Sequence, residues 1–307
     1  MPVAMGNAGS DPVLTNRAIG AYLGLAVGDA LGATTEFLTP REIREKYGIH
    51  KTIRGGGWLR LTAGQVTDDT GMSLALGQSI LTSRGVDAMS VAHAFSEWMR
   101  TKPVDIGNTV RRGIVNFRMT GIPEVPVNKF TAGNGACMRS LPIALYGWNA
   151  STKDLIESSR IQSHVTHNAP IADAGTETIV KMVVLALRGE SKESLRQCAC
   201  NLVRDHEIYR HDRKRVENPS AWIVETLQAV FQAFFSHDNF EDMLVDVVNR
   251  GGDSDTTGAI VGMLSGAFYG LDAIPTQWTR RLDSGVEGRC QEQAVRLVAL
   301  AGSGCFL

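Results

Sequence analysis

Apolar residues recur at intervals of three and four along nearly the whole of this 307-residue chain. Segment 16–31 shows the pattern, which places residues such as Ile19 and Leu23 on one face of a helix. Strand-like alternation is scarce, and only a short extended piece is expected near 52–61. The sequence therefore predicts an all-α protein. Comparable periodicity predicts further helices at 70–83, 87–100, 105–118, 135–146, 152–162, 169–188, 191–204, 220–235, 240–249, 256–270 and 290–300.

Nothing in the sequence divides the chain into separate units. It contains no internal repeat of about 20–50 residues, no long linker and no low-complexity segment. We therefore expect one compact domain, a multi-helix bundle over residues 14–301. The ends, 1–13 and 302–307, are expected to be mobile.

Charge and composition exclude several functional classes. Lys and Arg total 31 and Asp and Glu total 32, so no broad field favours nucleic acid or an acidic membrane. The N-terminus lacks the basic and apolar regions of a signal peptide, and no apolar run reaches the roughly 20 residues of a transmembrane helix. The five cysteines are odd in number and scattered, which disfavours a disulfide framework. We expect a cytoplasmic protein with no nucleic-acid partner and no transmembrane segment.

Two short acidic segments each stand at the start of a predicted helix. Segment 67–70 is Thr-Asp-Asp-Thr, and segment 252–256 is Gly-Asp-Ser-Asp-Thr. Either one alone is explained by helix capping, because Asp and Thr oxygens accept the free N–H groups of a first turn. One cap requires only one side chain, however, and each start carries two acids. If the segments meet in the fold, four carboxylates share one pocket and must be protonated or bind cations.

The donors that these segments offer are oxygens only. Such a set suits magnesium, manganese or calcium better than zinc or copper, and two adjacent ions are typical of hydrolytic centres. A calcium loop starting at Asp253 is excluded because its twelfth position is Leu264 rather than Glu. Gly258, Gly262 and Gly266 then share one helix face, so we expect a neighbouring helix to approach closely and this helix to lie deep.

The two acidic segments and three further motifs together resemble the ADP-ribosylglycohydrolase family. The resemblance implies an all-α fold with a central site for two divalent cations, manganese foremost and magnesium as the alternative. It also implies hydrolysis of the bond between ADP-ribose and a modified protein side chain. The further motifs are Gly28-Asp29-Ala30-Leu31-Gly32 with Glu36, Gly133-Asn134-Gly135-Ala136, and His167 between Thr166 and Asn168.

Within that family, segments 102–109 and 128–135 are most similar to members that act on the nitrogenase iron protein. This resemblance implies cleavage of the N-glycosidic bond to an arginine side chain. It also implies regulation by a PII-type signalling protein and recruitment to a membrane through a partner.

Matching the motifs residue by residue gives a metal site and two catalytic acids. Asp105 and Glu36 match the acids, and which of them donates the proton stays open. Taken alone, Asp105 is equally explained as a helix N-cap and Glu36 as a solvated turn residue. The implied metal ligands are Thr67, Asp68, Asp69, Asp253, Asp255 and Thr256.

Local sequence supplies candidates for substrate binding. The loop at Gly133, Asn134 and Gly135 precedes a predicted helix, where backbone N–H groups suit a diphosphate. Asn108 lies three residues after Asp105 and would share its helix face. His167 is a candidate contact to ribose or phosphate, and Tyr209 is a candidate for stacking on adenine. A plain turn explains the loop as well, and structural roles explain His167 and Tyr209.

Two other functions fit the same residues. An oxygen-lined two-metal site serves a nucleotide phosphohydrolase equally well, and a non-catalytic ADP-ribose-binding helical module would keep the pocket without turnover.

In the glycohydrolase, flanking carboxylates would stabilise the positive charge that develops at the ribose carbon and would move protons.

Overall fold

The computed structural model describes residues 11–129 and 132–302, and within them the chain is all-α. These residues form no β-strand, and the piece expected to be extended near 52–61 reduces to one isolated bridge between Gly56 and Leu61. Two short 3₁₀ helices, η1 (Glu207–Tyr209) and η2 (Leu271–Ala273), accompany the α-helices. The α-helices are α1 (Pro12–Gly32), α2 (Pro40–Tyr47), α3 (Asp68–Ser83), α4 (Ala88–Arg100), α5 (Asn108–Thr120), α6 (Leu141–Tyr146), α7 (Thr152–His164), α8 (Pro170–Leu187), α9 (Lys192–Asp205), α10 (Ile223–Ser236), α11 (Phe240–Val248), α12 (Ser254–Tyr269), α13 (Thr276–Thr279) and α14 (Ser284–Gly302).

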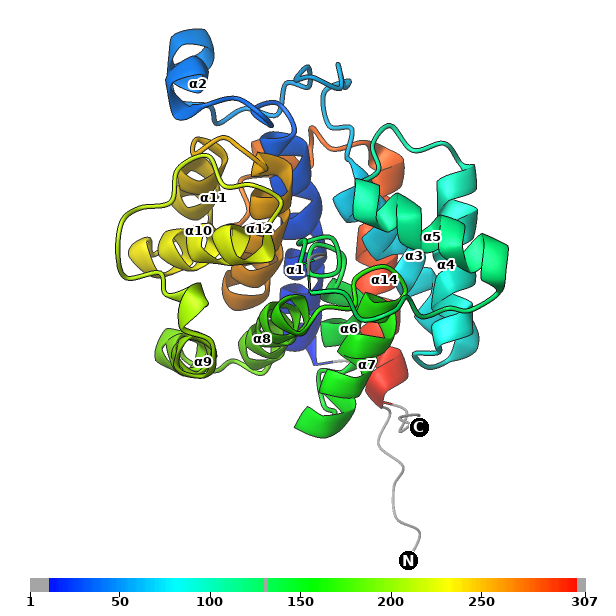
Figure 1. Ribbon diagram of the computed structural model, residues 1–307. Coiled ribbons are helices and arrows are strands. Elements are labelled where there is room, and N and C mark those ends of the chain that lie inside the picture. The colour runs from blue at the N-terminus through cyan, green and yellow to red at the C-terminus, as the bar shows by residue number, and fades with distance from the viewer. Residues whose placement is uncertain (1–10, 130–131, 303–307) are drawn as a thin grey trace, which may run out of the picture.

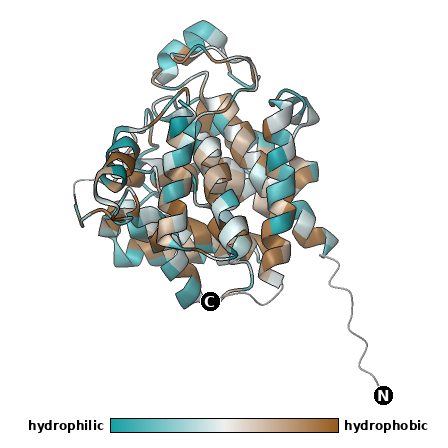
Figure 2. Cartoon of the chain, turned by 90° about the vertical axis from the view of Figure 1, so that its right-hand side faces the viewer, coloured by the Kyte–Doolittle hydropathy of each residue, from teal (hydrophilic) through white to brown (hydrophobic). Residues whose placement is uncertain are grey.

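Helices α2 and α13 were not predicted from periodicity. Both are short, and α2 buries only Ile43, so it carries no apolar stripe. Local chemistry starts it instead: Thr39 and Glu42 form a reciprocal capping box, and Pro40 occupies the first turn. The exposed, hydrophilic helix stands out at the top of the molecule (Figure 2).

Helices α1 and α12 lie side by side at the centre of the molecule with their backbones almost in contact (Figure 1). A Cβ atom added at Gly24 would lie 2.2 Å from the carbonyl oxygen of Gly262, and one at Gly28 would lie 2.0 Å from that of Gly258. Only glycine permits this approach. The expected close packing around the α12 glycines is therefore confirmed, and α12 is buried along almost its whole length.

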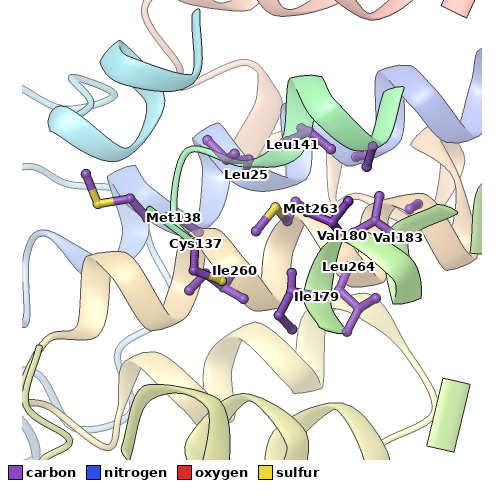
Figure 3. Packing of buried hydrophobic residues seen from close by; sticks show 14 of the residues in the cluster. Leu25, Cys137, Met138, Leu141, Ile179, Val180, Val183, Ile260, Met263 and Leu264 are labelled. Carbon is purple, nitrogen blue, oxygen red and sulfur yellow. The ribbon is translucent and has the colours of Figure 1, made fainter. Parts of the chain in front are cut away.

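The other helices surround this central pair. In Figure 1, α10 and α11 lie on one side of it and α3, α4 and α5 on the other. Apolar side chains from α1, α6, α8 and α12 pack together in the core, among them Leu25, Leu141, Val180 and Met263 (Figure 3). Because α1 packs against both α12 and α14, the two ends of the chain belong to one packed unit.

The packed helices extend slightly beyond the expected domain of 14–301, since α1 begins at Pro12 and α14 ends at Gly302. The remaining parts of the expected mobile ends, 1–10 and 303–307, lie outside the described residues, as do Phe130 and Thr131. Among the helices of the described chain, none combines the length and apolar character needed to cross a bilayer.

Candidate active site and metal centre

The two acidic segments meet at the N-termini of α3 and α12. The Oγ1 of Thr67 lies 3.5 Å from Oδ2 of Asp255, 188 positions away in sequence. The Oγ1 of Thr256 lies 3.4 Å from Oδ2 of Asp69. The convergence expected from the sequence is therefore confirmed: both helix starts form one site, with every member of the expected ligand set buried.

Helix capping does not account for these acids. The N-cap residue of α3 is Thr67 and that of α12 is Asp253, and neither side chain makes a capping hydrogen bond to its own helix. The second acid of each pair, Asp69 and Asp255, instead contributes to the contacts between the two segments.

The carboxylates are crowded and short of hydrogen-bond donors. One oxygen each of Glu36, Asp253 and Asp255 lie within 4.8 Å of one another. The Oδ1 of Asp69 is buried without a hydrogen-bond partner. Burial is the main cause that raises the pKa of all of these groups, and neighbouring carboxylates add to it. Such an arrangement matches the needs of hard divalent cations, which supply positive charge to closely spaced oxygens.

Asp29, near the C-terminal end of α1, organises the first segment from behind. Its carboxylate accepts hydrogen bonds from the backbone N–H groups and the hydroxyls of both Thr67 and Thr70, at 2.6–3.1 Å. Burial raises the pKa of Asp29 to about 6, although these hydrogen bonds oppose the shift. Sequence reasoning noted Asp29 only as part of a motif. An acid among the apolar residues of a deeply buried helix is the signal that could have identified it.

Glu36 follows α1 and lies against the second segment. The Nε1–H of Trp58 donates to its Oε2 at 2.6 Å, and burial raises the pKa of Glu36 to about 8. The adjoining backbone is fixed by Gly252, which accepts from the N–H of Phe37 at 2.7 Å and donates to Leu38 at 3.1 Å. Glu36 is therefore a buried residue rather than a solvated turn residue.

Asp105 is half-buried at the rim of the same site. Its Oδ1 accepts from the backbone N–H of Ile106 at 2.7 Å, and burial raises its pKa. Helix α5 begins only at Asn108 with Gly107 as N-cap, so neither the capping explanation nor the shared helix face proposed for Asp105 and Asn108 is correct. The N–H of Gly107 donates to Oδ2 of Asp68 at 3.1 Å, which ties this loop to the first acidic segment.

The glycine loop lies on the other wall. Asn134 donates from its side chain to Oδ2 of Asp253 at 2.6 Å and to Thr226 at 2.9 Å. A Cβ at Gly135 would lie 2.8 Å from the ring of His167, so glycine is needed for that approach. The expected helix start at 135 is wrong, because 135–139 forms turns and α6 begins at Leu141. The carbonyl oxygen of Asn134 accepts the N–H groups of Cys137 and Met138, and that of Cys137 accepts the N–H of Ser140, so the segment forms separate turns.

The last two candidates for substrate binding lie in different places. His167 lines the cavity beside Gly135, and burial lowers its pKa to about 3, so the ring is neutral. Tyr209 does not line it. That ring is fully buried between helices, and its hydroxyl donates to the carbonyl oxygen of Ile171 at 2.6 Å. Stacking of Tyr209 on adenine is therefore corrected to a packing role.

These walls enclose a cavity of about 470 Å³, a size typical of small-molecule sites. Thr67 and Asp69 lie behind its surface, and no Lys or Arg of the described chain lines it. Sequence reasoning missed two rings at its mouth, Phe37 and Trp58, because they belong to loops without periodic pattern. The expected site residues that line it are Glu36, Asp68, Asp105, Asn108, Gly133, Asn134, Gly135, His167, Asp253, Asp255 and Thr256.

Known proteins resemble this chain over nearly its whole length. A model of the ADP-ribosylglycohydrolase family matches residues 10–304. The ADP-ribosyl-[dinitrogen reductase] glycohydrolase of Rhodospirillum rubrum is 45% identical, over 95% of this chain and 98% of its own. The ADP-ribosylarginine hydrolase Tri1 of Pseudomonas putida is 32% identical, over 87% and 74%. A solved ADP-ribosylglycohydrolase-related protein complex superposes with a TM-score of 0.83 at 35% identity, covering 94% of this chain and 99% of that one.

Proposed function

Because the chain belongs to the ADP-ribosylglycohydrolase family, we propose that it is an ADP-ribosyl-(protein arginine) glycohydrolase. It hydrolyses the N-glycosidic bond between ADP-ribose and an arginine side chain of a target protein. Its target, by similarity to the Rhodospirillum rubrum relative, is ADP-ribosylated dinitrogen reductase, the iron protein of nitrogenase, which it thereby reactivates. The observation that carries the proposal is the meeting of the two acidic helix starts on one cavity beside Glu36.

We propose that the site holds two divalent cations, manganese foremost and magnesium as the alternative, and the cluster of buried carboxylates supports this. The residues that would hold them are Thr67, Asp68, Asp69, Asp253, Asp255 and Thr256, all oxygen donors, and the unpartnered Oδ1 of Asp69 supports this assignment. Bound there, the ions supply Lewis-acid polarisation to ribose hydroxyls and water.

The other cavity residues divide the remaining tasks. The loop at Gly133 and Gly135, with the neutral ring of His167, brings no carboxylate of its own to the cavity and offers backbone N–H groups suited to the diphosphate. Glu36, buried among the acids, is held as a carboxylate when the cations are bound and then stabilises positive charge developing at the ribose carbon. Asp105, half-buried and able to exchange protons with solvent, is the better placed acid for protonating the departing guanidine.

Product analysis tests this function. The protein is incubated with ADP-ribosyl-arginine and ADP-ribosyl-serine peptides, with and without manganese, and the products are identified by mass spectrometry. We expect manganese-dependent release of intact ADP-ribose and of unmodified arginine peptide. Release of phosphate or a nucleoside monophosphate would instead support the two-metal phosphohydrolase. Metal-dependent binding without hydrolysis over hours would support the non-catalytic ADP-ribose-binding module.

We also propose that the enzyme works in the cytoplasm and is controlled by a PII-type signalling protein that recruits it to a membrane. This proposal rests on the family resemblance, with the 45% identity to the Rhodospirillum rubrum enzyme as support. Co-purification of the two proteins, and fractionation of cells with and without the PII-type protein, test it. An enzyme that never co-purifies and stays in the same fraction in both strains contradicts it.

A further inference from the structure

Two large aromatic side chains stand exposed at the mouth of the cavity. Phe37 is 63% exposed and Trp58 is 52% exposed. The centroids of their rings lie 5.3 Å apart, and the ring planes meet at an angle of 51°. Both line the cavity next to Glu36. Exposed aromatic rings gathered at a cavity mouth mark a binding surface more often than a packing surface.

The backbone holds these rings in place. Phe37 adopts a φ of +60°, a conformation that is unfavourable for a side chain of this size. The hydrogen bonds of Phe37 and Leu38 to Gly252 hold it there, one residue before Asp253. Trp58 is fixed separately through its Nε1–H bond to Glu36. The pair is therefore positioned relative to both the acid and the second acidic segment.

The charges around the pair favour a cation. The carboxyl group of Glu36 accepts the Nε1–H at the edge of the Trp58 ring, Asp105 lines the same cavity, and no Lys or Arg of the described residues lines it. A guanidinium group is planar, weakly hydrated and permanently charged, so it stacks on aromatic faces while pairing with carboxylates. The rings and acids together match this group better than a neutral hydroxyl.

We propose that Phe37 and Trp58 form an aromatic platform that binds the guanidinium-bearing side chain of the substrate. The platform makes arginine-linked ADP-ribose a better substrate than a serine-linked one, which brings no cation to the rings. This inference rests on the proposed function. It agrees with the diphosphate position proposed at Gly133 and Gly135, two residues that contribute no carboxylate to the cavity.

Phe37→Leu is the discriminating variant, because the Phe37 side chain, unlike that of Trp58, makes no hydrogen bond to Glu36. Loss of one exposed cation–π contact corresponds to about a two- to fivefold change in binding. We expect the KM for an ADP-ribosyl-arginine peptide to rise by that factor with kcat within twofold, since the contact exists before and during bond cleavage. The inhibition constant of free ADP-ribose, which lacks the guanidinium, should stay unchanged.

Two further variants control the experiment. Phe37→Tyr keeps an aromatic ring and should retain the wild-type KM, even if Phe37→Leu proves unstable. Met119→Leu changes an exposed apolar side chain on α5 outside the cavity lining and should have no effect.

An unchanged KM in Phe37→Leu, or an equal loss of affinity for substrate and for free ADP-ribose, overturns the platform. So does a Phe37→Tyr enzyme with a KM raised as far as that of Phe37→Leu. A wild-type protein that releases no ADP-ribose from the arginine peptide would instead refute the proposed function, and the platform with it.

Discussion

At the scale of single residues, the site depends on a carboxylate that does not line the cavity. Asp29 accepts hydrogen bonds from both threonines that flank the acids of α3. It fixes the backbone of that helix start and orients the hydroxyl of Thr67 toward Asp69 and Asp255. Residues behind a metal centre commonly control the affinity of the site in this way.

Asp29→Asn should weaken metal binding without changing any of the proposed metal ligands. The amide nitrogen of the new side chain would face N–H and O–H groups and could not accept their hydrogen bonds. We expect this loss to lower the free energy of unfolding by about 1–3 kcal/mol. We expect manganese affinity to fall by about 10- to 100-fold, measured by isothermal titration. Asp272→Asn, an exposed acid that accepts one bond from Asn16, is the matched control. Equal manganese affinity in Asp29→Asn and the wild type would remove Asp29 from the account.

Asp69→Ala and Asp255→Ala should each abolish turnover while the helices persist. Each acid is a proposed metal ligand. Removing a residue that only supports a ligand costs up to about 100-fold in activity, so we expect the loss of a ligand itself to cost more than that. The rate of ADP-ribose release and the helical circular dichroism signal at saturating manganese are the measurements. Asp238→Ala, whose side chain is 98% exposed, serves as control. Full activity in Asp69→Ala or in Asp255→Ala contradicts the metal assignment.

At the scale of elements, the contact between α1 and α12 sets the geometry of the site. Asp29 is carried by α1 and Asp255 by α12, and the two helices touch at Gly28 and Gly258 immediately beside them. A side chain between the helices would separate the two sources of carboxylates. The glycine spacing therefore serves both the packing of the core and the position of the acids.

Gly24→Ala tests this contact away from the acids. The added methyl group would lie 2.2 Å from the carbonyl oxygen of Gly262, and neither helix can move without disturbing the core. We expect a loss of at least about 1–3 kcal/mol in unfolding free energy, measured by urea denaturation. Gly288→Ala on α14, where nothing lies within 4 Å, should instead stabilise by about 0.5–1 kcal/mol through helix propensity. The same sign of effect in both variants would refute the steric explanation.

At the scale of the whole molecule, folding concentrates acids that the unfolded chain keeps apart. Burial raises the pKa of Asp29 to about 6, of Asp68 to about 7 and of Glu36 to about 8. A carboxyl whose pKa is raised on folding stabilises the protein at low pH, and that stability is lost as the pH rises through the folded-state pKa. Metal-free protein should therefore weaken as the pH rises from the ordinary carboxyl pKa near 4 to about 8, and above about pH 6.5 the loss comes mainly from Asp68 and Glu36.

Thermal unfolding with a chelator and with saturating manganese tests this pH dependence. Burial lowers the pKa values of His50, His167 and His211, whereas the same residues in the unfolded chain are still about half protonated at pH 6.5, so they add a small stabilisation as the pH rises, equally with and without metal. We expect the midpoint in chelator to fall by several degrees from pH 6.5 to 8.5, and manganese to remove most of that fall because metal binding displaces protons. The pKa of His164 is raised mainly by its hydrogen bond to Asp173, so the stability that His164 contributes falls with rising pH in both samples. The difference in midpoint between the two samples therefore reports the buried acids. A midpoint in chelator that rises with pH would contradict the crowded-acid account.

The sequence by itself determined the helical fold, the close approach at the α12 glycines and the two acidic helix starts. Those properties depend on residues a few positions apart, whose spacing fixes which face of a helix they share. Only the tertiary structure decided that Asp29 supports the α3 acids, that Glu36 is buried and bonded to Trp58, and that Tyr209 lies away from the cavity. These contacts join segments remote in sequence or carried on loops, and no local periodicity records which of them will meet. Their partners are selected when the helices pack, because burying apolar faces brings the intervening loops to fixed places around one cavity.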